Sequence, residues 1–146
     1  RLALNPKAYP SRRDFDLDLF ARIEATGAEL LVLAGYMRIL DGEALHPWVG
    51  RMINIHPSLL PKYRGLHTHR RALEAGDLEH GASVHYVTAE LDGGPVIAQA
   101  RIGIEAGDHE DLLAQRLEMC GGGIGVRVLC LEVDRVAGSS LSRIHS

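Results

Sequence analysis

The apolar run at residues 29–35, Glu-Leu-Leu-Val-Leu-Ala-Gly, restricts the fold more than any other stretch of the chain. A strand this apolar needs cover on both faces, which a parallel sheet flanked by helices provides. Residues 14–27 precede it, carry Leu17, Phe20 and Ile23 at helical spacing, and end in a Thr-Gly pair. A helix that leads directly into a buried strand predicts an α/β layer.

The alternation of helix and strand continues along the chain. Residues 42–49 predict a short helix, residues 51–56 a strand, and residues 67–76 a second helix. Two further strands, at residues 81–88 and 95–102, are joined by a link so short that we expect them to pair antiparallel. We therefore predict an α/β, Rossmann-like core, a mostly parallel sheet with helices on both faces and an antiparallel strand pair toward the C-terminal side.

The composition fits one soluble globular domain. Of the 146 residues, 46% are hydrophobic and 24% charged, and the apolar runs fall far short of the roughly 20 residues that cross a membrane. The net charge of −3 gives no basic field, so nucleic acid is not expected as a partner. Two cysteines are too few for a disulfide framework and favour the cytoplasm. No metal site is expected, because His67 and His69 point to different faces of a helix.

Polar and apolar side chains alternate at residues 52–56, Met-Ile-Asn-Ile-His, as in a short strand. Asn54 and His56 therefore share one face, and Pro57 ends the strand because it has no N–H to donate. An amide that donates to developing negative charge and an imidazole that moves a proton form a usable catalytic pair. The alternative, a turn-capping asparagine and a hydrogen-bonded core histidine, stays open at this point.

A third polar residue follows in the link between the last two predicted strands. Asp92 stands there before two glycines, which allow the backbone to turn sharply. If the two strand ends are neighbours, its carboxylate lies beside His56, favours the imidazolium and fixes the orientation of the ring. A simple Asp-Gly turn is the other interpretation of this residue.

Several separated blocks, in one order, resemble the phosphoribosylglycinamide formyltransferase family of bacterial purine biosynthesis. They are Asn-Ile-His-Pro-Ser-Leu-Leu-Pro-Lys-Tyr at 54–63, Gly-Leu-His-Thr-His-Arg at 65–70, His-Gly-Ala-Ser-Val-His at 80–85 and Glu-Leu-Asp-Gly-Gly-Pro at 90–95. The resemblance implies an enzyme with a Rossmann-like formyltransferase core. Its expected reaction is the transfer of a formyl group from 10-formyltetrahydrofolate, the co-substrate, to the amine of glycinamide ribonucleotide in de novo purine biosynthesis.

The resemblance also implies roles for individual residues. Asn54, His56 and Asp92 would be catalytic, without a metal ion. The residues expected to line the folate site are Arg12, Met37, Arg38, Ile39, Leu40, Asn54, Thr88, Ala89, Glu90, Leu91 and Asp92. Glycinamide ribonucleotide and the formyl folate are the expected small-molecule partners, and a homo-oligomer remains open.

Three alternatives are kept. Arg64-Gly65 is similar to a feature of methionyl-tRNA formyltransferase, although residues 66–70 and the lack of a basic tRNA-binding extension favour the purine enzyme. A formyltetrahydrofolate hydrolase is the second alternative. A catalytically inactive remnant is the third.

The sequence departs from the family at both ends. Residues 1–10 read as a loop, so we expect residues 1–118 to form a core without the family's first strands and phosphate loop, with an exposed edge at residues 30–34. Residues 119–146 form an anomalous tail, because three glycines at 121–123 cost a helix roughly 1 kcal/mol each relative to alanine. A shift of the reading frame or a sequencing artefact is our preferred hypothesis for this tail. We do not expect these 146 residues alone to be active.

Overall fold

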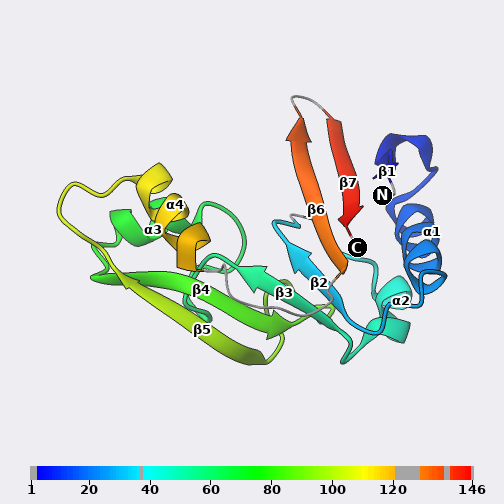
Figure 1. Ribbon diagram of the computed structural model, residues 1–146, viewed down its shortest axis with the longest axis horizontal. Helices are drawn as coiled ribbons and strands as arrows, with labels where there is room; N and C mark the ends of the chain where they lie inside the picture. Colours follow the sequence, from blue (N-terminus) through cyan, green and yellow to red (C-terminus); the bar gives the residue numbers. More distant parts are fainter. Residues whose placement is uncertain (1–2, 37, 121–128, 137–138, 146) are drawn as a thin grey trace.

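The chain folds around a seven-stranded mixed sheet (Figure 1). The computed structural model describes residues 3–36, 38–120, 129–136 and 139–145. The strands are β1 (Ala3–Leu4), β2 (Leu31–Ala34), β3 (Met52–His56), β4 (Glu79–Tyr86), β5 (Val96–Gly103), β6 (Leu129–Val136) and β7 (Ser139–His145). The helices are α1 (Arg12–Glu24), α2 (Gly42–Leu45), α3 (Thr68–Glu74) and α4 (Glu110–Cys120), with short 3-10 turns η1 (Pro6–Ala8) and η2 (His46–Trp48).

The strand order is β1-β7-β6-β2-β3-β4-β5. Parallel pairing is confined to the centre, where β2 lies between β3 and β6, and the other neighbouring strands are antiparallel. The α/β class and the antiparallel pair β4–β5 are confirmed. The sheet is mixed because β4 pairs with β3 and runs in the opposite direction. Helix α3 lies between these two strands in the chain but does not make them parallel.

Two expectations about the sheet were wrong. Residues 1–10 contain a two-residue strand, β1, which pairs with β7. The expected free edge at residues 30–34 is instead paired, since β6 runs parallel to β2 with Leu31 opposite Leu129. Ladder pairing satisfies the backbone N–H and C=O groups of β2, which an edge strand would leave to solvent. Residues 121–123, the predicted helix stop, lie outside the described part of the chain.

The apolar core lies between α1 and one face of the sheet. Phe15, Leu19 and Ile23 of α1 are at most 1% exposed and pack with Leu31 and Met52 of the strands. Burial of each such side chain stabilises the fold by about 1.5–3 kcal/mol. The predicted start of this helix at residue 14 is corrected to Arg12, since the Ser11 hydroxyl accepts the Asp14 N–H at 3.1 Å and caps α1.

Helices α3 and α4 lie over β4 and β5, away from α1 (Figure 1). His69 of α3 contacts the buried His80 of β4, with 2.9 Å between Nδ1 and Nε2. Ala114 of α4 lines the same cavity as Ile55 and Ala82 of the strands. Met52 packs with α1, whereas Ile55 lines the cavity beside α4. Because these two residues are three positions apart in β3, they lie on opposite faces of the sheet. The two helix groups therefore cover opposite faces, as predicted.

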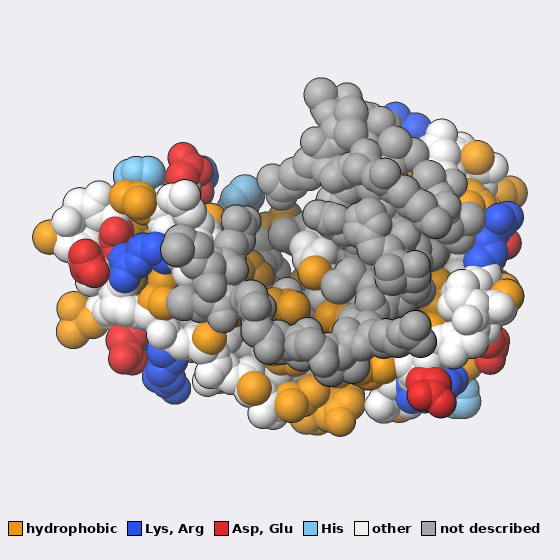
Figure 2. All heavy atoms as spheres, viewed as in Figure 1, with side chains coloured by type: hydrophobic (Ala, Val, Ile, Leu, Met, Phe, Trp, Pro, Cys, Tyr) orange, Lys and Arg blue, Asp and Glu red, His pale blue; other side chains and the backbone are white. Residues whose placement is uncertain are grey.

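Charged side chains of both signs lie side by side at the rim of the face shown in Figure 2. Ion pairs at the surface include Arg101 with Glu79 and Lys62 with Asp77. Exposed pairs of this kind contribute about 0–1 kcal/mol each, so they matter little to the fold. Among the described residues, no helix is both long and apolar enough to span a membrane.

Candidate active site

Strand β3 carries the predicted pair on its buried side. Asn54 is 9% exposed and His56 5%, whereas Ile55 between them is 37% exposed. The prediction that Asn54 and His56 share one face is confirmed. The loops at residues 57–65 and 88–92 contact His56, and Asn54 contacts His85 of β4.

The loop after β3 contacts the His56 ring through its backbone. Tyr63 has a φ of +55°, in the left-handed region that is unusual for a side-chain-bearing residue. Its carbonyl oxygen lies 2.9 Å from His56 Nε2 and accepts a hydrogen bond from it. His56 Nε2 therefore carries a proton, and Nδ1 is the nitrogen that faces Asp92.

Ser83 of β4 makes hydrogen bonds to the backbone of the loop at residues 57–65. Its fully buried hydroxyl donates to the Ser58 carbonyl at 2.6 Å and accepts from the Leu60 N–H at 3.0 Å. Gln99 of β5 donates to both the Ser83 hydroxyl and the Leu60 carbonyl at 2.9 Å. These buried bonds fix the start of the loop, since an unpaired buried polar group would cost about 1–3 kcal/mol.

Asp92 lies between two histidines, although it is distant from both in sequence. Its side chain is 8% exposed, and Oδ2 lies 3.4 Å from His56 Nδ1 and accepts the Gly65 N–H at 2.8 Å. Oδ1 lies 3.6 Å from His85 Nε2. Asp92 has a φ of +48°, so this link is a turn whose carboxylate also reaches the site. The predicted proximity of Asp92 to His56 is confirmed.

The pKa of the Asp92 carboxyl is lowered from its usual value. Burial acts to raise that pKa, but the contacts with His85, the Gly65 N–H and the charge on His56 together outweigh it. The carboxylate is therefore charged at neutral pH.

His85 is part of the site, although no role was predicted for it from the sequence. It is 2% exposed, and its Nε2 lies 3.2 Å from the Asn54 amide nitrogen. The cross-strand register places Asn54 directly opposite His85. Its presence in the block at residues 80–85 was the available signal, but only the register of β3 with β4 shows the contact.

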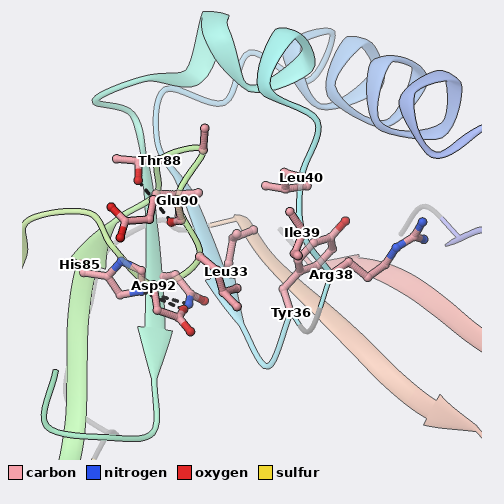
Figure 3. A pocket seen from close by; sticks show the side chains of 13 residues that line it. Leu33, Tyr36, Arg38, Ile39, Leu40, His85, Thr88, Glu90 and Asp92 are labelled. Atoms are coloured by element: carbon pink, nitrogen blue, oxygen red, sulfur yellow. Dashed lines mark hydrogen bonds and ion pairs between the residues drawn. The ribbon is translucent and has the colours of Figure 1, made fainter. Parts of the chain in front are cut away.

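Two cavities meet at this constellation. A small pocket of about 50 Å³ lies between the loop at residues 38–40 and the loop at residues 88–92 (Figure 3). A larger cleft of about 690 Å³ continues toward α4. Asn54 and Asp92 line both cavities, so a ligand in each would meet beside them.

Most of the residues predicted for the folate site line the small pocket. They are Arg38, Ile39, Leu40, Asn54, Thr88, Ala89, Glu90, Leu91 and Asp92. The Arg38 side chain points away from the pocket, with its guanidinium 4.6 Å from the centre of the Phe15 ring (Figure 3). Arg12 is exposed in the first turn of α1 and lines neither cavity, so its role stays a prediction. Met37 lies outside the described residues.

A buried carboxyl group supports the pocket from α1. Asp16 is 1% exposed and accepts the Asp41 N–H at 2.9 Å, which ties the end of the pocket loop to the helix. Burial raises the pKa of Asp16, and the positive charges of Arg38 and Arg12 oppose this effect. Burial also raises the pKa of the nearby Tyr36 hydroxyl, which stays neutral. Across the described ranges, no group of three His, Cys, Asp or Glu residues is placed to hold a metal ion.

Two joined cavities with an amide, an imidazole and a carboxylate at the junction define a candidate active site of an α/β protein. The chain belongs to the formyl transferase family, whose sequence profile, described as formyl transferase, matches residues 2–129. Within that family it is similar to phosphoribosylglycinamide formyltransferases, as the sequence blocks implied. It is 55% identical to the protein of that name from Escherichia coli strain K12 over 111 residues, covering 76% of this chain and 52% of the relative.

Other relatives agree. The trifunctional purine biosynthetic protein adenosine-3 of Drosophila melanogaster is 41% identical over 136 residues, covering 93% of this chain and 10% of the relative. The structure of a phosphoribosylglycinamide formyltransferase from Coxiella burnetii matches with a TM-score of 0.74 at 51% identity, covering 79% of this chain and 54% of the other. Glycinamide ribonucleotide transformylase 1 of Symbiobacterium toebii matches with a TM-score of 0.76 at 46% identity, covering 78% and 54%. This chain thus spans about half the length of its bacterial relatives.

Proposed function

We propose that this chain carries the folate pocket and catalytic groups of an enzyme that transfers a formyl group from 10-formyltetrahydrofolate to the amine of glycinamide ribonucleotide. The carrying observation is that Asn54, His56 and Asp92 lie where two cavities join. The names of its relatives support the choice of substrates. Both substrates are water-soluble, and we place the reaction in the cytoplasm. A homo-oligomer is compatible with this proposal.

The small pocket, about 50 Å³, is too small to hold the ring system of a folate alone, so we propose that the ring binds across this pocket and the adjoining part of the cleft. Apolar side chains of Leu33, Ile39 and Leu91 line the small pocket, and the loop at residues 88–92 supplies backbone groups that can bind ring nitrogens. The larger cleft has room for the amine substrate. The formyl carbon would lie between the two, next to Asn54.

The reaction needs stabilisation of an oxyanion and movement of protons. Attack of the amine nitrogen on the formyl carbon forms a C–N bond and places negative charge on the formyl oxygen. The Asn54 amide N–H and the His56 imidazolium can donate to that oxygen. The attacking nitrogen loses a proton, the folate nitrogen gains one as its C–N bond breaks, and His56 beside Asp92 is suited to carry the proton between them.

One contact must change for His56 to reach a substrate. Both of its ring nitrogens have partners within the protein, Nε2 with the Tyr63 carbonyl and Nδ1 with Asp92. We propose that the hydrogen bond between His56 Nε2 and the Tyr63 carbonyl breaks. The contact with Asp92 is the one retained, because the Gly65 N–H also holds that carboxylate in place. A shift of the loop at residues 57–65 would expose Nε2 to the formyl group.

The test is a steady-state assay of the full-length protein with glycinamide ribonucleotide and 10-formyltetrahydrofolate. Parallel reactions without the amine, and with methionyl-tRNA in its place, measure hydrolysis and tRNA formylation. Formyl transfer to glycinamide ribonucleotide that exceeds both alternatives supports the proposal. A folded protein with only hydrolytic or tRNA-directed activity would refute it.

A further inference from the structure

The hydrogen bonds of His85 define which of its ring nitrogens carries hydrogen. Nδ1 lies 2.9 Å from the carbonyl oxygen of Tyr86. A carbonyl oxygen only accepts hydrogen bonds, so Nδ1 must donate and therefore carries a hydrogen. The remaining question is the state of Nε2.

The Asn54 amide next to Nε2 indicates whether this nitrogen of His85 carries a hydrogen. The Asn54 amide nitrogen lies 3.2 Å away, and an amide NH2 group only donates. Asp92 Oδ1, at 3.6 Å, is beyond hydrogen-bond distance. With the Asn54 amide in this orientation, Nε2 accepts with its lone pair, and His85 is the neutral tautomer with hydrogen on Nδ1.

This tautomer selects one orientation of the Asn54 amide. A flipped amide would place Oδ1 against the lone pair of Nε2, and two acceptors repel each other. In the observed orientation, Oδ1 is buried and has no hydrogen-bond partner among the described residues. The NH2 end faces His85, and both residues line the small pocket. An NH2 group has two hydrogens, so one remains to donate to a ligand.

We propose that His85 is a positioning residue that holds the donor end of the Asn54 amide toward the formyl oxygen. It acts through Asn54 and needs no proton transfer of its own. This inference rests on the proposed function, because it assumes that the Asn54 amide meets an oxyanion there.

A second arrangement would also satisfy the distances. His85 would then be an imidazolium, and the Asn54 amide would be flipped so that Oδ1 accepts from Nε2. The charged or titratable groups that face His85 are Asp92 at 3.6 Å and His56, whose ring centre is 6.5 Å away. The two arrangements differ in the hydrogen on Nε2, which can be measured directly.

The first test is the 15N NMR spectrum of the histidine rings in the full-length protein at pH 7.5, with His85 assigned by comparison with His85→Gln. The expected result is a protonated Nδ1 and an unprotonated Nε2. A ring protonated on both nitrogens, or on Nε2 alone, would overturn the inference. This result does not depend on formyl transfer.

The second test uses side chains of different reach. Glutamine extends far enough to offer an acceptor near the position of Nε2, asparagine extends only to the region of Nδ1, and phenylalanine fills the space without an acceptor. We expect His85→Phe and His85→Asn to lower kcat about 10- to 100-fold with little change in the KM of the folate, since misplacing a catalytic donor costs this much. His85→Gln should recover most of the loss.

The exposed His46, replaced by glutamine, is the matched control and should leave kcat unchanged. Equal losses in His85→Gln and His85→Phe, with both proteins folded by circular dichroism, would overturn the positioning role. If the unsubstituted protein transfers no formyl group, the proposed function fails instead, and the NMR result still decides the tautomer.

Discussion

Asp92 Oδ2 lies 3.4 Å from His56 Nδ1, although α3, β4 and the loops around them separate the two residues in the chain. The Gly65 N–H holds the same oxygen at 2.8 Å, so the loop after β3 and the loop after β4 are joined through one carboxylate. This contact brings together residues that are far apart in sequence and that we propose act as one catalytic unit, and the prediction for His56 depends on it.

Replacement of His56 by alanine should lower kcat by about two to four orders of magnitude, the usual contribution of a general acid–base group. Circular dichroism and thermal unfolding of the full-length protein should show a retained fold. His46→Ala is the control. Near-normal formyl transfer by a folded His56→Ala protein would remove His56 from the mechanism.

Asp92 should make stability depend on pH under acidic conditions. Its folded pKa lies below the usual value of 3.8, so its stabilising contribution is complete above that value and is lost as the pH falls through the lowered pKa. Asp92→Asn should lack this loss between pH 4 and pH 2. Chemical unfolding of both proteins over that range measures it. Identical slopes would mean that the carboxylate has no net favourable partners.

His80 should have an effect of the same sign, at higher pH. Burial and the neighbouring His69 lower the pKa of His80 from 6.5 to about 4. Between these two pH values, His80 is protonated in the unfolded chain but not in the folded one. Stability should therefore fall as the pH drops from 6.5 to about 4, by about 3 kcal/mol at most. His80→Gln should reduce this fall. The free energy of unfolding at pH 7 and pH 4.5 for both proteins is the measurement, and an unchanged fall would contradict the prediction.

Ile39 should contribute to folate binding, because it lines both cavities and is 51% exposed in this structure. Ile39→Ala removes apolar surface worth about 1–2 kcal/mol, which raises the dissociation constant of a folate about 5- to 30-fold. Val49→Ala is the control, since Val49 is 65% exposed and lines neither cavity. Equal affinities of the two variants in calorimetry would place the folate elsewhere.

Local patterns predicted much of the fold. The apolar run before Gly35 became β2, and the alternation from Met52 to His56 placed Asn54 and His56 on one face, as found. Both follow from the spacing of side chains along a single element. The pairing of β2 with β6 was not predictable in this way, because register between distant strands depends on packing of the whole chain.

The missed parts of the site have the same origin. The contact of His85 with Asn54 follows from the β3–β4 register, and the Tyr63 carbonyl reaches His56 only because Tyr63 has a positive φ. Neither the register nor a left-handed tyrosine has a signal in one sequence. Asp92 was predicted to lie beside His56 only if the two strand ends are neighbours, and its catalytic role came from the resemblance to formyltransferases.

The most direct test of the central claim is the turnover of a chimera in which the matched residues of this chain replace those of the Escherichia coli relative. The chimera, its His56→Ala variant and the 146-residue chain are assayed with glycinamide ribonucleotide and 10-formyltetrahydrofolate. We predict formyl transfer by the chimera, a loss of at least about a hundredfold in the His56→Ala variant, and no measurable transfer by the 146 residues alone. A folded chimera that binds both substrates but transfers no formyl group, or one whose turnover is indifferent to His56, would contradict the account.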